Sequence, residues 1–219
     1  MDLDVVLFGR WEFVSPEQEA KAILHKKPFG ITADFFRLAN SSGNFTRGVS
    51  SLTDFVSVIR EALEPADARL NSLGILCHSS GDSLMISGSL NADPILFLRL
   101  TLITPRQVRT LLGPALSGLR GKILPEAQIT LYGCHTASSY EVPVDLLDAF
   151  ATAFQVSCYG FKRGLQVCVN INRGVITDRG YIRVDDGSDQ SQKHTCQAAG
   201  CTQDLRELKP DAVRAFVRI

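Results

Sequence analysis

Two Cys-His dipeptides in this sequence combine the side chains that thiol catalysis requires. Cys77-His78 is the first and Cys134-His135 is the second. A thiol attacks a carbonyl carbon as its thiolate. Imidazole, with a free pKa of about 6.5, is the side chain best suited to accept the thiol proton near neutral pH. The two dipeptides therefore indicate a hydrolase with a cysteine nucleophile.

The four side chains can combine into two alternative dyads. Neighbouring residues of a strand point to opposite faces of a sheet, so His78 can meet Cys134 on one face, or Cys77 can meet His135 on the other. Spacing alone does not choose between them. In the first dyad the histidine precedes the cysteine by 56 positions, which is closer to the order and spacing of caspases than to those of papain.

Both dipeptides end short apolar runs that are typical of strands buried on both faces. Such runs are DVVLFG at 4–9, LGILCH at 73–78, ITLYG at 129–133 and VSCYGF at 156–161. The polar sequence Ser-Ser-Gly-Asp follows the second run, and Thr-Ala-Ser-Ser follows the third. In open α/β sheets the site forms at the carboxyl ends of the strands, so these two loops are where chemistry is expected.

Helical patterns separate the strands. Ser or Thr caps, Pro at the first turn and apolar residues three or four apart predict helices over about 16–27, 52–63, 105–116 and 143–154. Alternating patterns predict a hairpin over 84–103 and two or three antiparallel strands over 166–184. The polar stretch at 40–44 predicts a loop, and the segment from Pro210 a short helix.

Strands alternating with helices predict one α/β domain over 1–219. We expect three layers, with a mainly parallel sheet flanked by helices and antiparallel hairpins near the C-terminus. The core should span about 1–184, and the segment 185–204 is polar enough to form a tail outside it.

Composition excludes several classes of function. Lys plus Arg and Asp plus Glu both number 23, so the formal charge is zero and nucleic acid is not an expected partner. The run 95–103 is too short for a membrane-spanning helix, and the acidic N-terminus is unlike a signal peptide. Gly9-Arg10-Trp11 stands where a nucleotide-binding sheet would carry a Gly-rich loop. We expect a cytoplasmic protein, unless a specialised machine exports it.

Six scattered cysteines in a chain of this length indicate free thiols in a reducing compartment and not a disulfide scaffold. Zinc is the alternative use of the two dipeptides, but alternation along the strands prevents all four side chains from converging. A looser group, for which the sequence offers no fourth ligand, consists of His194, Cys196 and Cys201. We therefore expect neither a metal nor another cofactor.

ILCHSSGDSLMISG at 75–88 and ITLYGCHTAS at 129–138 resemble the two signature segments of caspase-like cysteine peptidases, the clan that includes gingipains, separases and bacterial CHAT proteins. The resemblance covers about 73–165, and the self-cleaving protease domains of large bacterial toxins are similar in size. It implies that Cys134 attacks a peptide carbonyl while His78 handles the proton. The substrate would be a protein, including this chain itself, and the family pattern together with Gly133 favours this dyad over its rival.

The resemblance also implies an oxyanion hole formed by the backbone N–H groups of Cys134 and Ser79. The family usually has Gly where Ser79 stands. A serine keeps the N–H but lacks the backbone freedom of glycine, so either the loop turns at Gly81 instead or the hole is distorted. This departure supports the alternative of a catalytically inactive module that acts in protein interaction or regulation.

Charges near the dyad would set substrate preference. Lys162 and Arg163 would favour an acidic P1 side chain, whereas Asp82 would favour a basic one. A basic run is completed by Arg173, Arg179 and Arg183. The toxin protease domains bind inositol hexakisphosphate on a basic surface in the corresponding region, so a small anionic ligand or an activating partner is the alternative to a simple solvated face.

Overall fold

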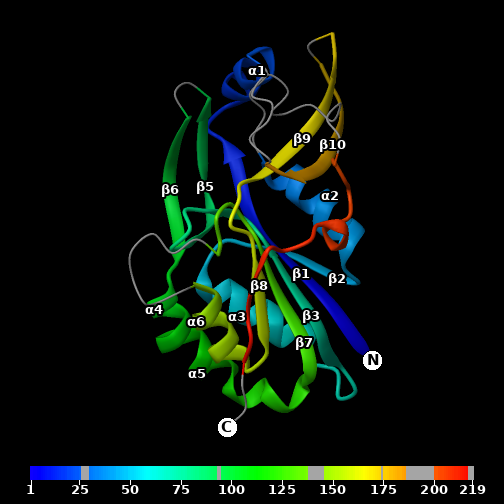
Figure 1. The fold of residues 1–219 in the computed structure, drawn as a ribbon. Helices are drawn as coiled ribbons and strands as arrows, with labels where there is room; N and C mark the ends of the chain where they lie inside the picture. Colours follow the sequence, from blue (N-terminus) through cyan, green and yellow to red (C-terminus); the bar gives the residue numbers. More distant parts are fainter. Residues whose placement is uncertain (26–29, 93–94, 138–145, 174, 186–199, 217–219) are drawn as a thin grey trace.

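The computed structural model describes residues 1–25, 30–92, 95–137, 146–173, 175–185 and 200–216. Its centre is a sheet of five parallel strands (Figure 1). Four of them follow the order β8-β7-β3-β1, and β2 also pairs with β1. These strands are β1 (Asp2–Phe13), β2 (Phe45–Val49), β3 (Arg69–Leu76), β7 (Ile123–Tyr132) and β8 (Ser157–Gly160).

Antiparallel elements extend this sheet at both ends and add a second one. The outer half of β1 pairs with β5, which is antiparallel to both β4 and β6. At the opposite edge, β11 pairs with β8. A separate two-stranded sheet consists of β9 and β10. The bounds are β4 (His78–Ser79), β5 (Leu84–Ala92), β6 (Ile95–Ile103), β9 (Leu165–Asn172), β10 (Val175–Val184) and β11 (Ala212–Arg214).

Helices cover both faces of the central sheet. One face, which we call the α3/α6 face, packs against α3 (Leu52–Ala62), α6 (Leu146–Phe154) and a helical run made of α4 (Pro105–Gln107), η1 (Val108–Leu112), α5 (Gly113–Leu116) and η2 (Ser117–Lys122). The other, the α2/β9 face, is covered by α2 (Thr32–Ser42), the β9–β10 hairpin and η3 (Leu205–Glu207), while α1 (Pro16–Leu24) lies beside the outer end of β1 and β5. The expected three-layer α/β fold is confirmed.

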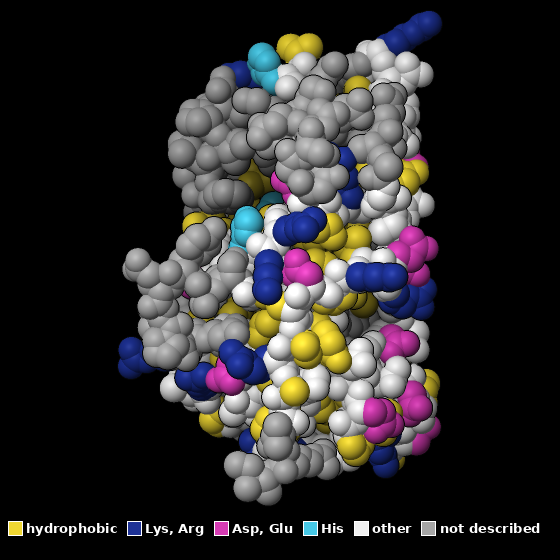
Figure 2. Space-filling model, in the orientation of Figure 1, with side chains coloured by type: hydrophobic (Ala, Val, Ile, Leu, Met, Phe, Trp, Pro, Cys, Tyr) yellow, Lys and Arg dark blue, Asp and Glu magenta, His cyan; other side chains and the backbone are white. Residues whose placement is uncertain are grey.

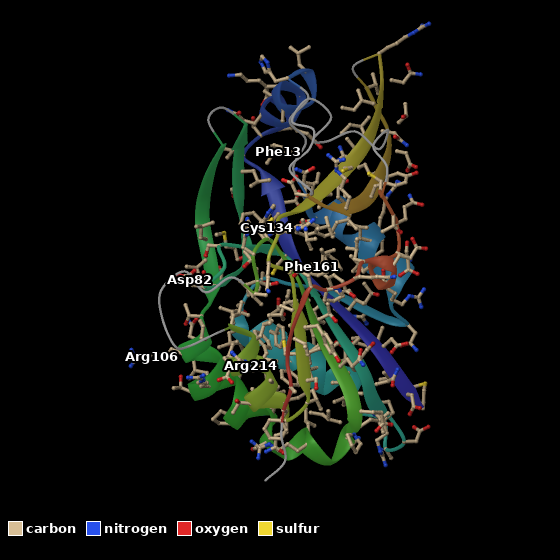
Figure 3. All side chains as sticks on the ribbon, in the orientation of Figure 1. Phe13, Asp82, Arg106, Cys134, Phe161 and Arg214 are labelled. Carbon is tan, nitrogen blue, oxygen red and sulfur yellow. The ribbon has the colours of Figure 1, made fainter. Side chains whose placement is uncertain are left out.

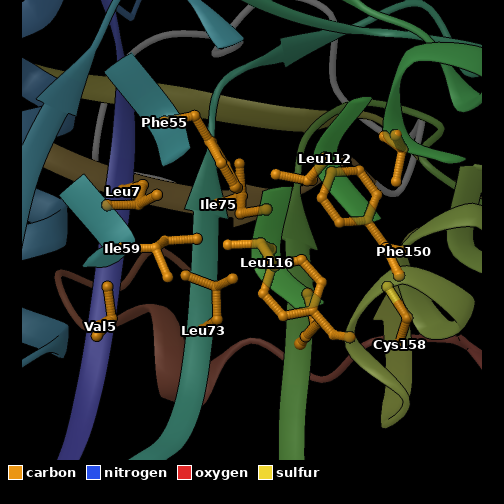
Figure 4. Packing of buried hydrophobic residues seen from close by; sticks show 14 of the residues in the cluster. Val5, Leu7, Phe55, Ile59, Leu73, Ile75, Leu112, Leu116, Phe150 and Cys158 are labelled. Carbon is orange, nitrogen blue, oxygen red and sulfur yellow. The ribbon is translucent and has the colours of Figure 1, made fainter. Parts of the chain in front are cut away.

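Each face has its own apolar cluster, because successive residues of a strand point to opposite sides. On β1, Val5 and Leu7 join the cluster of the α3/α6 face, whereas Val6 and Phe8 join that of the α2/β9 face. Figure 4 shows the first cluster, in which Val5 and Leu7 of β1 lie beside Ile59 of α3, with Phe55 of the same helix farther along the sheet. Burying one such side chain contributes roughly 1.5–3 kcal/mol, so the continuous apolar runs of the strands specify a sheet covered on both faces.

The predicted caps begin their helices as expected. The Ser51 hydroxyl accepts a hydrogen bond from the Asp54 N–H at 3.0 Å at the start of α3. Thr104 does the same for the Gln107 N–H at 3.3 Å, with Pro105 in the first turn. These contacts satisfy backbone donors that have no partner inside the helix.

Two expectations about local structure are wrong. The segment 40–44 is not simply a loop, because its first three residues complete α2, which buries Phe35 and Leu38, and β2 starts directly after it. The segment from Pro210 forms β11 and not a helix. A strand edge is available there on β8, and Val213 pairs with Tyr159, so backbone pairing overrides the local helical preference. The predicted helix start at 142–143 lies outside the described residues.

Among the described residues, no helix has both the length and the apolar character needed to cross a membrane.

Candidate active site

The ends of β3 and β7 bring the two Cys-His dipeptides together. Leu76 pairs with Tyr132, and the Cys77 N–H then donates to the Tyr132 carbonyl at 3.1 Å. His78 and Cys134 each lie two positions beyond the Leu76–Tyr132 pair, so the register of β3 and β7 predicts that they stand opposite each other. Leu76 and Tyr132 belong to the cluster of the α2/β9 face, so alternation directs His78 and Cys134 toward that same face.

His78 is partly buried between aromatic rings of the α2/β9 face. Its ring lies edge-on to Trp11, with centroids 4.6 Å apart, and 5.5 Å from the Phe35 ring. Its Nε2 lies 3.2 Å from the Gly30 carbonyl oxygen. A carbonyl oxygen only accepts, so Nε2 carries a proton and Nδ1 of the neutral ring is the acceptor.

Burial lowers the pKa of His78 to about 4, and the hydrogen bond to Gly30 opposes that shift. The imidazole is therefore neutral at pH 7. In this state Nδ1 can accept a proton, as a general base must, but the low pKa makes the ring a weak base until its surroundings become more polar.

The Cys134 thiol is held by the start of β9. Its Sγ donates to the Leu165 carbonyl at 3.3 Å and accepts from the Leu165 N–H at 3.4 Å. Burial raises the pKa of Cys134, the Leu165 hydrogen bond opposes this, and Asp185 adds to it. Neither His78 nor Cys134 is among the groups that shift the pKa of the other. The structure thus presents a protonated thiol and a neutral imidazole, not an ion pair.

Thr136 fixes the turn that follows Cys134. Its buried hydroxyl donates to the Leu131 carbonyl at 3.1 Å and accepts from the Phe161 N–H at 3.0 Å. Figure 3 shows Cys134 near the middle of the molecule, with Phe161 close to it and Asp82 farther out. The Thr136 hydroxyl therefore joins the end of β7 to the end of β8 and fixes the turn that begins at Cys134.

The turn after His78 falls at Gly81, which has a φ of 96°, and the Ser80 N–H donates to the Ser83 carbonyl at 3.2 Å. With Gly first in this two-residue turn, Ser80 and Ser83 form a hydrogen-bonded pair. Alternation then makes Ser79 and Leu84 a non-bonded pair, whose N–H groups point away from each other. Extended backbone at Ser79 is accessible to any residue, so the missing glycine distorts nothing here.

Gly133 allows the two strand ends to approach closely. A Cβ built there would lie 3.0 Å from both the Cys77 carbonyl oxygen and the Ser79 Cβ. The segments that carry the N–H groups of Ser79 and Cys134 are therefore in contact at Gly133. A side chain at this position would push them apart.

Cys77 and His135, the alternative dyad, lie in different surroundings. Cys77 is 3% exposed and belongs to the α3/α6 cluster, where burial raises its pKa. His135 has a positive φ of 56°, and its Nδ1 lies 2.8 Å from the Lys162 carbonyl oxygen at the surface. Cys77 therefore lies in the core and His135 at the surface, although Cys134 is close enough to Cys77 to raise the pKa of that thiol further.

The predicted specificity residues lie at two different places. The Asp82 carboxylate, in the turn between β4 and β5, accepts from the Ser80 hydroxyl at 2.6 Å. Lys162 and Arg163 lie beside the residue after Cys134, because the Arg163 carbonyl accepts from the His135 N–H at 3.0 Å. On the face drawn in Figure 2, a histidine and several Lys and Arg side chains gather near the middle of the molecule, with an acidic side chain among them.

The basic run does not form one solvated strip. Arg179 donates to Glu19 at 2.7 Å and lies 3.5 Å from buried Asp34, and Arg183 is only 7% exposed and donates to Gln166. These contacts occupy both guanidinium groups inside the protein, so Arg179 and Arg183 join the hairpin to neighbouring residues and differ in their surroundings from exposed Arg173. Arg173 lies exposed at the far end of β9.

Sequence reasoning missed Gly30 and Leu165, which both act through backbone atoms and so leave no side-chain signal. It also missed Trp11 and Phe35, whose apolar character is equally typical of core residues.

Among the described residues, no group of three or more His, Cys, Asp or Glu side chains could hold a metal ion. His194 and Cys196 lie outside the described residues. No family model, curated protein or solved structure matches this chain.

Proposed function

We propose that this protein is a cysteine peptidase that cleaves a protein substrate, with Cys134 as nucleophile and His78 as general base. The observation that carries the proposal is the register of β3 and β7, because His78 and Cys134 each lie two positions beyond the paired Leu76 and Tyr132 of the α2/β9 face. The Gly30 carbonyl supports it further, because it keeps the proton on Nε2, so that the lone pair a general base needs is on Nδ1.

In the proposed reaction, the Cys134 sulfur attacks the carbonyl carbon of the scissile peptide bond while its proton moves to His78 Nδ1. The resulting oxyanion would accept hydrogen bonds from the N–H groups of Cys134 and Ser79, and losing one such donor costs about 10²–10³ in rate in other hydrolases. His78 then protonates the leaving amine as the C–N bond breaks. Water, deprotonated by His78, hydrolyses the thioester and the thiol is restored.

Leu165 must give up the thiol before this reaction can start. Leu165 and Val184 form a non-bonded pair of the β9–β10 ladder, since the Asp185 N–H donates to the Gly164 carbonyl beside them. The N–H and carbonyl of Leu165 therefore point out from the ladder, to Cys134. The same N–H and carbonyl could pair with the backbone of an extended peptide. A peptide substrate could therefore take the place of the Cys134 thiol on Leu165.

The test compares three single substitutions on casein, on internally quenched peptides and on self-cleavage. Cys134→Ala should abolish hydrolysis, and His78→Ala should lower it by about 10²-fold or more. His135→Ala is the matched control, because it removes the neighbouring histidine of the rival dyad and should leave activity near that of the unchanged protein. Equal hydrolysis by the Cys134→Ala protein would sink the proposal.

A second candidate function is a catalytically inactive module for protein interaction or regulation. The observations that favour it are the raised pKa of Cys134 and the two hydrogen bonds that hold its thiol. A limiting reaction with iodoacetamide, mapped by mass spectrometry, separates the two candidates. A peptidase should label at Cys134 before the other five cysteines and more slowly after His78→Ala, whereas an inactive module should label Cys134 slowly in both proteins.

A further inference from the structure

A second pair of sulfur atoms lies away from the candidate active site, where the C-terminal segment meets the β9–β10 hairpin. Cys168 of β9 is opposite Tyr181 of β10, and the next residue of β10, Ile182, exchanges two backbone hydrogen bonds of 2.8 and 2.9 Å with Thr202. This pairing brings Cys201 against the hairpin. The Cys201 thiol lies close enough to Cys168 to raise the pKa of that thiol, and the Cys168 Sγ donates to the Gln166 carbonyl at 3.6 Å.

The two thiols differ in access to solvent. Cys168 is 0% exposed, whereas Cys201 is partly exposed. Burial and, to a smaller extent, the neighbouring Cys201 raise the pKa of Cys168 to about 12, although Arg183 opposes the shift. A small oxidant in solution should therefore react first at Cys201, with Cys168 held beside the product.

Arg183 supplies a positive charge at the pair. Its guanidinium is almost fully buried and donates to the Gln166 side-chain oxygen at 2.9 and 3.1 Å, and its charge favours the thiolate form of Cys168. Within the described part of the chain, no carboxylate forms an ion pair with Arg183. A buried cation beside two neighbouring thiols favours the negative charge that thiol oxidation needs.

We propose that Cys168 and Cys201 form a reversible disulfide that fastens the C-terminal segment to β9, with hydrogen peroxide as the class of oxidant. The Cys201 thiolate attacks one peroxide oxygen, so that an S–O bond forms and the O–O bond breaks, and the leaving hydroxide takes up the proton that the Cys201 thiol released to become the first water. Cys168 then attacks the sulfenic sulfur, the S–S bond forms, and the departing hydroxide takes a proton to become the second water. Two thiols lose two electrons, the peroxide gains them, and a thiol reductant reverses the change by exchange.

The test uses the full chain, reduced and then exposed to limiting hydrogen peroxide. Remaining thiols are alkylated and the protein is cleaved with trypsin, which puts Cys168 in the peptide 164–173 and Cys201 in the peptide 194–206. The second peptide also contains Cys196, so Cys196→Ser is the matched control. We expect the two peptides to be cross-linked in the unchanged protein and in Cys196→Ser, and the link to be lost in Cys201→Ser.

Thermal melting gives a second measurement that needs no peptide mapping. The oxidised protein should melt at a higher temperature than the reduced protein, and the difference should vanish with a thiol reductant and in Cys201→Ser. Cys168→Ala should abolish the difference too, and circular dichroism checks that this buried substitution still folds.

The proposal is overturned if limiting peroxide links other cysteines while Cys201 stays open to alkylation. It is also overturned if the purified protein holds one equivalent of zinc that both Cys168→Ala and Cys201→Ser lose, since the pair would then be metal ligands. Both outcomes are independent of hydrolysis, so failure here leaves the proposed peptidase untouched.

Discussion

The two faces of the sheet are built from different kinds of residue. The α3/α6 face is apolar throughout its buried cluster, and its two cysteines, Cys77 and Cys158, pack there as small apolar groups. The α2/β9 face buries the carboxylate of Asp34, and the aromatic rings of Trp11 and Phe35 in its cluster contact His78 at its edge. One face supplies stability, and the other combines stability with polar groups that can react.

The largest expected effect concerns stability of the apolar face. Phe150→Ala should lower the free energy of unfolding by about 3–5 kcal/mol, because its ring is fully buried between Phe55 and Phe154. Urea titration measures the loss. Phe161→Ala, which empties a buried position on the α2/β9 face next to Thr136, should cost a similar amount and also lower hydrolysis per folded molecule. If Phe150→Ala lowers hydrolysis equally, the two faces do not divide their roles as described.

The next effect is a pH dependence that belongs to the α2/β9 face. Burial raises the pKa of Asp34 from 3.8 to about 6, although Arg179 of β10 opposes the shift; Glu19 of α1 adds to it. Because the unfolded chain releases this proton first, the stabilisation that protonated Asp34 contributes is complete below about pH 4 and is lost as pH rises through about 6, by up to about 3 kcal/mol.

Asp34→Asn should remove that fall, since an amide does not titrate between pH 4 and 7. Urea unfolding of both proteins at pH 4, 5, 6 and 7 isolates the contribution, because other groups titrate alike in the two. Parallel curves for the two proteins would contradict the assignment.

The smallest effect on stability contrasts one residue type on the two faces. Cys158→Ala should cost about 1–2 kcal/mol, because its sulfur is fully buried in the α3/α6 cluster, and should leave hydrolysis per folded molecule unchanged. Cys134→Ala should cost less stability and abolish hydrolysis. Thermal melting and a peptide assay on the same samples test both predictions. If Cys158→Ala abolishes hydrolysis and Cys134→Ala does not, the reactive thiol belongs to the α3/α6 face and the assignment is wrong.

Much of this arrangement could be predicted because it depends on side chains and strand periodicity. The apolar runs ending at Cys77-His78 and Gly133-Cys134 indicated buried parallel strands, and neighbouring strands of that type bring their ends together. Gly30 and Leu165 could not be predicted. They contact His78 and Cys134 through backbone atoms, which any residue type supplies, and their positions depend on how α2 and the β9–β10 hairpin pack.

The missed elements have equally local causes. α2 ends in Asn40, Ser41 and Ser42, which are polar because two face solvent and the third donates its hydroxyl to the Leu38 carbonyl at 2.7 Å. A window centred on these residues shows only loop composition. β11 exists because β8 offers an unpaired edge, which is a property of the assembled sheet and not of residues 212–214.

The position of β1 in the sheet determines how readily its backbone amides become exposed to solvent. Its residues Val5 to Phe8 pair with β2 on one side and with β3 on the other, and its last four residues pair with β5. An amide there can exchange its hydrogen with solvent only after neighbours on both sides have separated, so these amides should be among the slowest to exchange in the molecule. The strand that carries Trp11 to His78 is thus also the one that binds the parallel sheet and the β5–β6 hairpin into a single cooperative unit.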